Sequence, residues 1–411
     1  MNSDTASLRI NATRLGDRLH ELGQIGATVD GICRLALSAE DGAGRDLVLR
    51  WMRELGLLVS IDAIGNVVGV RPGTESGPPV MTGSHIDTVR TGGYYDGNLG
   101  VLAGLEVIQT LHDAGIQTRR PLAVAFFTNE EGARFNPDMM GSLVYVGGMA
   151  LDAALSTVGI DGATVGECLE RIGYAGPQPC GQPQVQAYVE LHVEQGPVLE
   201  AEGFHIGAVD GVQGISWTEF TVLGVSNHAG TTPMRLRHDA GYVAFAIANY
   251  ARQIASDMGA NQVATVGAIQ LSPNLVNVIP YKAVLTVDLR NTDEAALQLA
   301  EQRLHRFAND IASAEGVTLS SRQLARFEPV DFDPDSISLV EATAKRLGLR
   351  VKRMPSGAGH DAQMLARVCP TAMIFVPSAG GISHNMKEFT SPADLEAGAN
   401  VLLHTLLRLA S

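Results

Sequence analysis

Histidine and carboxylate side chains stand beside glycine in four segments of the chain, in patterns that could bind metal ions. Residues 83–88 read Gly-Ser-His-Ile-Asp-Thr and residues 92–97 read Gly-Gly-Tyr-Tyr-Asp-Gly. The candidate ligands in the four segments are His85, Asp96, Glu130, Glu131, His192 and His384. Imidazole nitrogens combined with carboxylate oxygens suit two Zn²⁺ or similar divalent ions better than the all-oxygen shells of Ca²⁺ or Mg²⁺.

The adjacent pair Glu130-Glu131 is expected to divide its labour, because neighbouring side chains at a strand end cannot both face one way. One would bind metal, and the other would take the proton from a metal-held water. Asp87 could accept the second ring N–H of His85 and so fix its tautomer. Each piece alone is a common accident, so the prediction rests on their occurrence together.

The elements that must position these residues are short buried strands. Residues 80–84, 122–128 and 188–193 are apolar runs typical of such strands, and residues 99–111 show helical spacing. In an open α/β sheet, ligands bind beyond the carboxyl ends of the strands. The candidate ligands are therefore expected at one edge of an α/β domain.

The middle of the chain has a different pattern, which predicts an inserted domain. Its strands are expected at residues 217–222, 263–270 and 282–289, with helices at 239–256 and 294–314. Half-exposed strands with two helices suit a small sheet covered on one face. After it, a buried strand at 371–376 and a helix at 392–407 complete the first domain. The predicted division is an α/β domain over 1–212 and 330–411, with an α+β insertion over 213–329.

The composition excludes several classes of protein. The 411 residues include 30 Lys and Arg against 44 Asp and Glu, which gives a formal net charge of −14. No basic face is expected that could bind nucleic acid or an acidic membrane surface. No apolar run approaches the ~20 residues that span a bilayer, and no signal peptide is visible. The four cysteines form no C-x-x-C pair, so reduced thiols in a cytoplasmic protein are expected.

The order of these motifs resembles the M20 metallopeptidase and amidohydrolase family. Longer motifs look like its hydantoinase/carbamoylase branch: Asn-Glu-Glu-Gly-x-Arg-Phe at 129–135, Glu-x-His-x-Glu-Gln-Gly-Pro at 190–197 and Asn-His-Ala-Gly-Thr-Thr-Pro-Met at 227–234. His192 is informative because the peptidase branches typically carry Asp or Glu there. The fold implied is a zinc-peptidase-like domain with a mixed sheet flanked by helices, interrupted by a ferredoxin-like dimerisation and lid domain.

The resemblance implies a role for each candidate residue. It makes His85, Asp96 (bridging), Glu131, His192 and His384 the ligands of two divalent ions, Zn²⁺ or else Mn²⁺, Co²⁺ or Ni²⁺. It makes Glu130 the general base and gives Asp87 the orienting role. The implied substrate contacts are Gln195, His228, Asn277, Arg290 and residues 356–361, which include Gly359 and His360.

The residues themselves support only part of this assignment. Arg290 ends a predicted strand and could clamp a carboxylate bidentately, although a solvated strand-end charge is the alternative. His228 could equally be a loop histidine and Asn277 a turn residue. The glycines of 356–361 could serve only a turn. A nucleotide site there is excluded because no G-x-G-x-x-G or lysine-containing phosphate loop follows a strand.

The implied activity is metal-dependent hydrolysis of the ureido C–N bond of an N-carbamoyl-L-amino acid. The products would be the free amino acid, CO₂ and ammonia. The alternatives are an allantoate amidohydrolase, a β-ureidopropionase, a hydrolase of another N-acyl amino acid, or a metal-binding protein without turnover. Glu130 beside Glu131 argues against the last, because a binding protein needs no base. The expected partners are a small anionic substrate and a second copy of the chain, and the sequence leaves open which subunit supplies His228.

Overall fold

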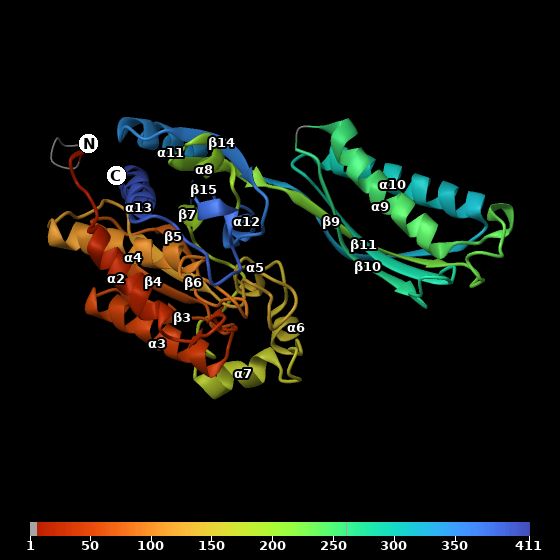
Figure 1. Ribbon diagram of the computed structural model, residues 1–411. Helices are drawn as coiled ribbons and strands as arrows, with labels where there is room; N and C mark the ends of the chain where they lie inside the picture. Colours follow the sequence, from red (N-terminus) through yellow and green to blue (C-terminus); the bar gives the residue numbers. More distant parts are fainter. Residues whose placement is uncertain (1–5, 260) are drawn as a thin grey trace. The chain divides into compact units, whose positions relative to one another are not determined.

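The computed structural model describes residues 6–259 and 261–411 of the chain, which forms two compact units (Figure 1). The first unit comprises Met1–Gly211 and Asp331–Ser411, and the inserted unit comprises Val212–Val330. The bounds of the inserted unit lie one residue outside the expected range at each end. None of the helices in the described part of the chain is long and apolar enough to cross a lipid bilayer.

A mixed sheet of nine strands forms the core of the first unit. Its centre consists of four parallel strands: β15 (Thr371–Val376), β7 (Ala187–Val193), β5 (Val80–His85) and β6 (Leu122–Phe127). All residues of these four strands are buried, as their apolar runs predict. Antiparallel strands flank them: β4 (Val67–Arg71) and β3 (Leu58–Ile61) on one side, β8 (Ile206–Val212) on the other. The parallel centre brings four strand ends to one edge of the sheet.

Two long helices, α4 (Asn98–Asp113) and α13 (Pro392–Leu409), pack against the sheet. Gly100 of α4 lies so close to the strands that a Cβ atom there would stand 2.6 Å from the Leu191 carbonyl oxygen. Glycine therefore lets the first turn of α4 approach the strand ends closely. Because Asp96 lies just before that turn, the same approach brings it to the edge of the sheet.

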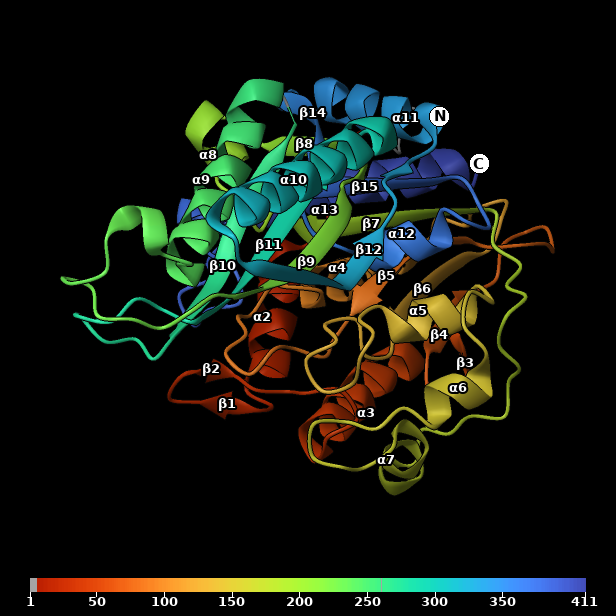
Figure 2. The ribbon, with the colours of Figure 1, turned by 90° about the vertical axis from the view of Figure 1, so that its right-hand side faces the viewer.

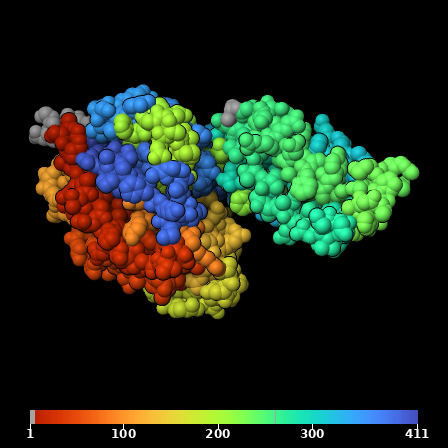
Figure 3. All heavy atoms as spheres, in the orientation of Figure 1, coloured from red at the N-terminus to blue at the C-terminus, as the bar shows by residue number. Residues whose placement is uncertain are grey.

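The N-terminal segment runs along α13, so that the two ends of the described chain lie side by side (Figure 3). The Asn400 side-chain oxygen accepts the Ile10 N–H at 3.0 Å, and the His404 ring bonds the Leu8 carbonyl at 3.0 Å. The helix that follows, α2 (Ala12–Gly23), was not expected from the sequence and packs on α4. The remaining elements of the first unit are β1 (Ala27–Thr28), β2 (Gly31–Ile32), α3 (Ala39–Glu54), α5 (Met140–Tyr145), α6 (Leu151–Leu155), α7 (Val165–Ile172), α8 (Val198–Glu202), β13 (Val330–Asp331), α11 (Pro334–Arg346), β14 (Val351–Ser356), α12 (Asp361–Leu365) and η2 (Ala379–Gly381).

The inserted unit is a four-stranded antiparallel sheet in the order β10-β11-β9-β12. Its elements are β9 (Gly214–Leu223), η1 (Met234–Leu236), α9 (Ala240–Met258), β10 (Val263–Ser272), β11 (Lys282–Asn291), α10 (Glu294–Glu315) and β12 (Thr318–Phe327). This β-α-β-β-α-β connectivity is that of a ferredoxin-like unit. Both long helices cover the same face of the sheet (Figures 1 and 2). Alternate residues of β11, such as Leu285 and Val287, form the core beneath them.

Candidate active site

The five side chains expected to bind metal lie together at the carboxyl edge of the parallel strands. His85 ends β5, and His192 is the penultimate residue of β7. Glu131 follows β6, Asp96 precedes α4, and His384 lies in the loop between β15 and α13. Each ligand therefore comes from a different segment, and the sheet topology brings the segments together.

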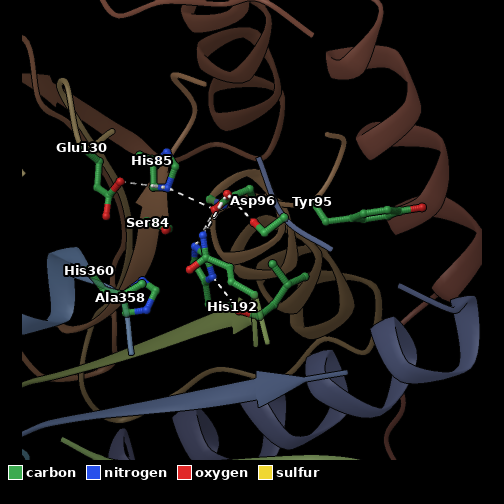
Figure 4. A network of polar contacts seen from close by, with 12 residues as sticks. Ser84, His85, Tyr95, Asp96, Glu130, His192, Ala358 and His360 are labelled. Carbon is green, nitrogen blue, oxygen red and sulfur yellow. Dashed lines mark hydrogen bonds and ion pairs between the residues drawn. The ribbon is translucent and has the colours of Figure 1, made fainter. Parts of the chain in front are cut away.

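Asp96 is the centre of this arrangement (Figure 4). Its Oδ1 lies 3.2 Å from His192 Nε2 and 3.8 Å from His85 Nε2. Its Oδ2 lies 3.2 Å from His384 Nε2, which is also 3.2 Å from Glu131 Oε2. Two groups of three ligands result, His85–Asp96–His192 and Asp96–Glu131–His384, each with its ligand atoms within 4.8 Å of one another. Asp96 belongs to both groups, as a bridging carboxylate would.

The hydrogen bonds of the histidines fit a role as metal ligands. His85 Nδ1 bonds the Asp87 carbonyl at 2.9 Å, and His192 Nδ1 bonds the Val193 carbonyl at 2.9 Å. Because a carbonyl only accepts, Nδ1 carries the proton and Nε2 presents a lone pair. His192 Nε2 indeed accepts the Gly97 N–H at 3.1 Å. Imidazole nitrogens that face carboxylate oxygens in this way form the mixed donor set that divalent cations such as Zn²⁺ prefer.

Asp87 supports the site in a different way from the one expected. Its backbone carbonyl, not its carboxylate, holds the His85 ring. The carboxylate instead accepts the backbone N–H groups of Glu130 and Glu131, at 3.2 and 3.3 Å. One residue thus orients a histidine through its main chain and the Glu-Glu pair through its side chain.

Glu130 is buried beside the ligands, with its Oε2 3.4 Å from His85 Nε2. Burial raises the pKa of Glu130 well above its usual range, and the charges of Asp361 and Glu131 add to the effect. A carboxylate with a raised pKa is a stronger base. Glu131 is the member of the pair that meets His384 and Asp96, so the two side chains face different partners.

A cavity of about 110 Å³ opens onto these residues. Gln195 lines it and donates its amide to Asp96 Oδ2 at 3.0 Å. Gly359 and His360 line it as well, and the His360 ring lies 4.6 Å from the His192 ring. Burial lowers the pKa of His360 well below its usual range, so the ring is neutral and its Nε2 pairs with Ser356 Oγ at 2.8 Å. Three of the expected substrate contacts therefore share one cavity with the candidate ligands.

The other three expected contacts lie in the inserted unit. His228 and Asn277 are exposed on neighbouring loops, joined by a bridge between His228 and Val278 and by a bond from the Ala229 N–H to the Asn277 carbonyl at 2.9 Å. Arg290, near the end of β11, pairs with the Asp288 carboxylate, its Nε and Nη2 standing 3.0 and 2.9 Å from Oδ2. Arg290, which was expected to bind a substrate carboxylate, therefore binds the carboxylate of Asp288 on its own strand.

Several buried residues of the site were not identified from the sequence. Glu388 Oε1 accepts the Tyr95 and Asp96 backbone N–H groups, at 2.9 and 3.1 Å. Glu190 bonds Ser84 Oγ at 2.6 Å, and it forms a third group of candidate ligands with His192 and His360. The spacing Glu190-Leu191-His192 could have revealed Glu190, because alternate residues of a strand share a face. No local pattern marks Glu388.

Known proteins resemble this chain over nearly its whole length. The model of Peptidase family M20/M25/M40 matches residues 81–408. An N-carbamoyl-L-amino-acid amidohydrolase of Rhizobium meliloti is 43% identical to this chain, and the match covers 98% of this chain and 97% of the relative. An N-carbamoyl-L-amino acid amidohydrolase of Geobacillus stearothermophilus is 40% identical, and the match covers 98% of this chain and 99% of the relative. Among solved structures, an amidase of the hydantoinase/carbamoylase family from Burkholderia multivorans superposes on this chain with a TM-score of 0.96. The two sequences are 46% identical, and the match covers 98% of this chain and 99% of the amidase chain. The chain therefore belongs to the M20/M25/M40 family, whose α/β fold with a mixed sheet and helices it shares.

Proposed function

We propose that this protein hydrolyses the ureido C–N bond of N-carbamoyl-L-amino acids. The observation that carries the proposal is the position of Glu130 beside two ligand groups that share Asp96. The relatives of Rhizobium meliloti and Geobacillus stearothermophilus, named for this activity, resemble the chain over nearly its full length. The products would be the free amino acid, CO₂ and ammonia.

In this proposal, His85, Asp96 and His192 would hold one divalent ion, and Asp96, Glu131 and His384 the other. When bound, such ions lower the pKa of a water molecule and polarise a carbonyl group. Glu130 takes the proton of the attacking water, whose oxygen forms a bond to the ureido carbon. Glu130 then delivers that proton to the amino-acid nitrogen as its bond to the ureido carbon breaks. The carbamate released decays to CO₂ and ammonia, so the atoms balance.

Gln195, Gly359 and His360 would contact the substrate inside the cavity. Arg290 would bind the carboxylate of the amino acid in place of Asp288, because its planar guanidinium forms paired hydrogen bonds with a carboxylate. The ions and Arg290 together would supply the positive charge that an anionic substrate needs in an acidic protein.

The geometry of the inserted unit favours a homodimer in which His228 and Asn277 serve the partner's site. His228 lies beside the start of β11, where Lys282 pairs with Leu223, whereas Arg290 lies near its end. Arg290 lies eight positions beyond Lys282 along the strand, which at ~3.3 Å per residue is roughly 26 Å. The carbamoyl carbon and the carboxylate carbon of the substrate are only three bonds apart. One substrate therefore cannot reach His228 and Arg290 of the same chain.

Mixing two inactive variants tests this arrangement. Glu130→Gln and His228→Ala chains, each inactive alone, would form mixed dimers in which one site has every residue. With both chains expressed equally, we expect about a quarter of all sites to be complete, so that activity recovers to about a quarter of the wild-type value. No recovery despite mixed dimers would place His228 in its own chain's site.

A substrate panel tests the activity itself. Ammonia and amino-acid release would be measured with N-carbamoyl-L- and D-amino acids, N-carbamoyl-β-alanine, allantoate, and N-acetyl and N-formyl amino acids, each with Zn²⁺, Mn²⁺, Co²⁺ or Ni²⁺. We expect the highest kcat/KM for an N-carbamoyl-L-amino acid. Preference for allantoate, N-carbamoyl-β-alanine or an N-acyl compound would replace the proposal by that activity.

A further inference from the structure

Asp138 is a carboxylate of the cavity wall to which the proposed reaction assigns no role. It lies on residues 128–141, a loop that folds back on Glu130. The Met139 N–H bonds the Glu130 carbonyl at 2.8 Å, and the Gly141 N–H bonds the Thr128 carbonyl at 2.7 Å. The loop that carries the proposed base therefore also carries Asp138.

The interior of this loop is fixed by a buried side chain. The Asn129 amide donates to the Phe135 carbonyl at 2.9 Å and to the Pro137 carbonyl at 3.1 Å. Gly132 packs on the backbone of Asp138, where a Cβ atom would stand 2.9 Å from its Cα. Asp138 is consequently held in place before any substrate arrives, as a binding residue must be.

The carboxylate of Asp138 is half-buried in the cavity wall and has no side-chain partner. Burial raises its pKa, and only its own backbone N–H counteracts that shift. Within residues 6–259 and 261–411, no side chain forms an ion pair or a hydrogen bond with it. A carboxylate that faces the cavity without a side-chain partner is available to accept a hydrogen bond from a ligand there.

The size of the cavity limits which part of a substrate can meet Asp138. Its volume is about 110 Å³. A cavity of about 150 Å³ holds benzene, with its six non-hydrogen atoms. The smaller cavity therefore has room for the four non-hydrogen atoms of a ureido group, while the rest of the amino acid must extend outside.

We propose that Asp138 accepts a hydrogen bond from the terminal NH₂ of the substrate's carbamoyl group and so selects N-carbamoyl over N-acyl amino acids. This inference rests on the proposed function. The terminal NH₂ is one bond from the carbon under attack, and Asp138 lies on the same loop as the base that serves that carbon. An acetyl or formyl group has no N–H at that position, so Asp138 would stay unpaired in its complex.

The test compares substrates in Asp138→Ala and Asp138→Asn variants, with Asp152→Asn as the control. Asp152 is exposed on α6, so its change removes the same charge outside the cavity. We expect kcat/KM for an N-carbamoyl-L-amino acid to fall about 10- to 100-fold in Asp138→Ala and less in Asp138→Asn. For the N-formyl and N-acetyl analogues, we expect less than about a threefold change. If these analogues are not hydrolysed, their inhibition constants provide the same comparison.

The outcomes separate this inference from the proposed function. Suppose that the wild-type enzyme hydrolyses N-carbamoyl-L-amino acids. If the Asp138 variants then lose kcat/KM equally for carbamoyl and acyl compounds, or lose none, the role of Asp138 alone is overturned. A loss confined to substrates with basic side chains would assign Asp138 to the side chain instead. A wild-type protein that hydrolyses no ureido compound would overturn both proposals. Unchanged metal content and melting temperature in the variants exclude misfolding as the cause.

Discussion

The Asp87 carboxylate accepts the backbone N–H of Glu130 at 3.2 Å. Asp87, the expected orienting residue, therefore holds the main chain of the proposed base. The Glu131 N–H bonds the same carboxylate at 3.3 Å. A single buried side chain thus sets the direction of two consecutive peptide groups, and with it the directions in which the two glutamates point. The adjacent pair can divide its roles because its backbone is held in this way.

Replacing Asp87 by alanine should weaken catalysis without unfolding the protein. The two N–H groups would lose their acceptor, and both glutamates would lose their fixed orientation. We expect kcat/KM to fall about 10- to 100-fold, the usual effect of removing a group that orients a metal ligand. Steady-state kinetics with metal analysis would measure it, and wild-type activity would show that the Glu-Glu pair needs no such support.

Glu130→Gln should abolish turnover while leaving bound metal in place. Glutamine fills the same buried space but cannot take a proton, and Glu130 belongs to neither of the two ligand groups that share Asp96. We expect a fall in kcat of about 10²- to 10⁴-fold. Metal stoichiometry by plasma mass spectrometry is the paired measurement. Substantial residual kcat would assign the base to another group.

Metal removal should affect the two ligand groups unequally. The His384 side chain is 49% exposed, whereas those of His85 and His192 are 1% exposed. We therefore expect a chelator to remove first the ion held by Asp96, Glu131 and His384. His384→Ala should bind one ion per subunit and the wild type two. Two ions in His384→Ala would contradict this ligand assignment.

Glu388 should support metal binding although it belongs to none of the ligand groups. Glu388→Ala would leave the Tyr95 and Asp96 N–H groups without their acceptor and free the loop that carries Asp96. Gly93→Ala should have a similar effect, because its Cβ would stand 2.4 Å from Glu388 Oε1. We expect metal affinity to fall about 10- to 100-fold in both, measured by competition with a chromogenic chelator. Unchanged affinity in both variants would limit Glu388 to a structural role.

His404 should make the protein less stable in mild acid. Burial lowers the pKa of His404 below its usual 6.5, and the nearby charges of Arg9 and Arg346 also oppose protonation. The unfolded chain then binds more protons than the folded one as pH falls through 6.5, so the free energy of unfolding decreases. We expect the melting temperature to drop between about pH 7.5 and about pH 5.5. The drop should be smaller in His404→Gln, and equal drops would assign the effect to other groups.

The amino-acid sequence was sufficient to predict the local elements and the types of ligand. Strand β15 and the start of β6 lie where the pattern of apolar residues places them, because a buried strand shows in consecutive residues. Helix α3 begins at Ala39, although its first turn carries polar residues that interrupt the helical pattern of its apolar side chains. Its cap, Ser38, accepts the Asp41 N–H at 3.2 Å.

The tertiary structure decided which of these residues meet. Glu388 and Asp96 are 292 positions apart, and the bond between them depends on α4, β15 and the following loop being packed together. The contact of the Asp87 carboxylate with the Glu130 and Glu131 N–H groups, and the place of Asp138 in the cavity wall, depend equally on how separate segments fold back on each other. Sequence patterns record the periodicity of a strand or a helix, which is local. Contacts between distant segments are set by packing, and only the folded chain contains them.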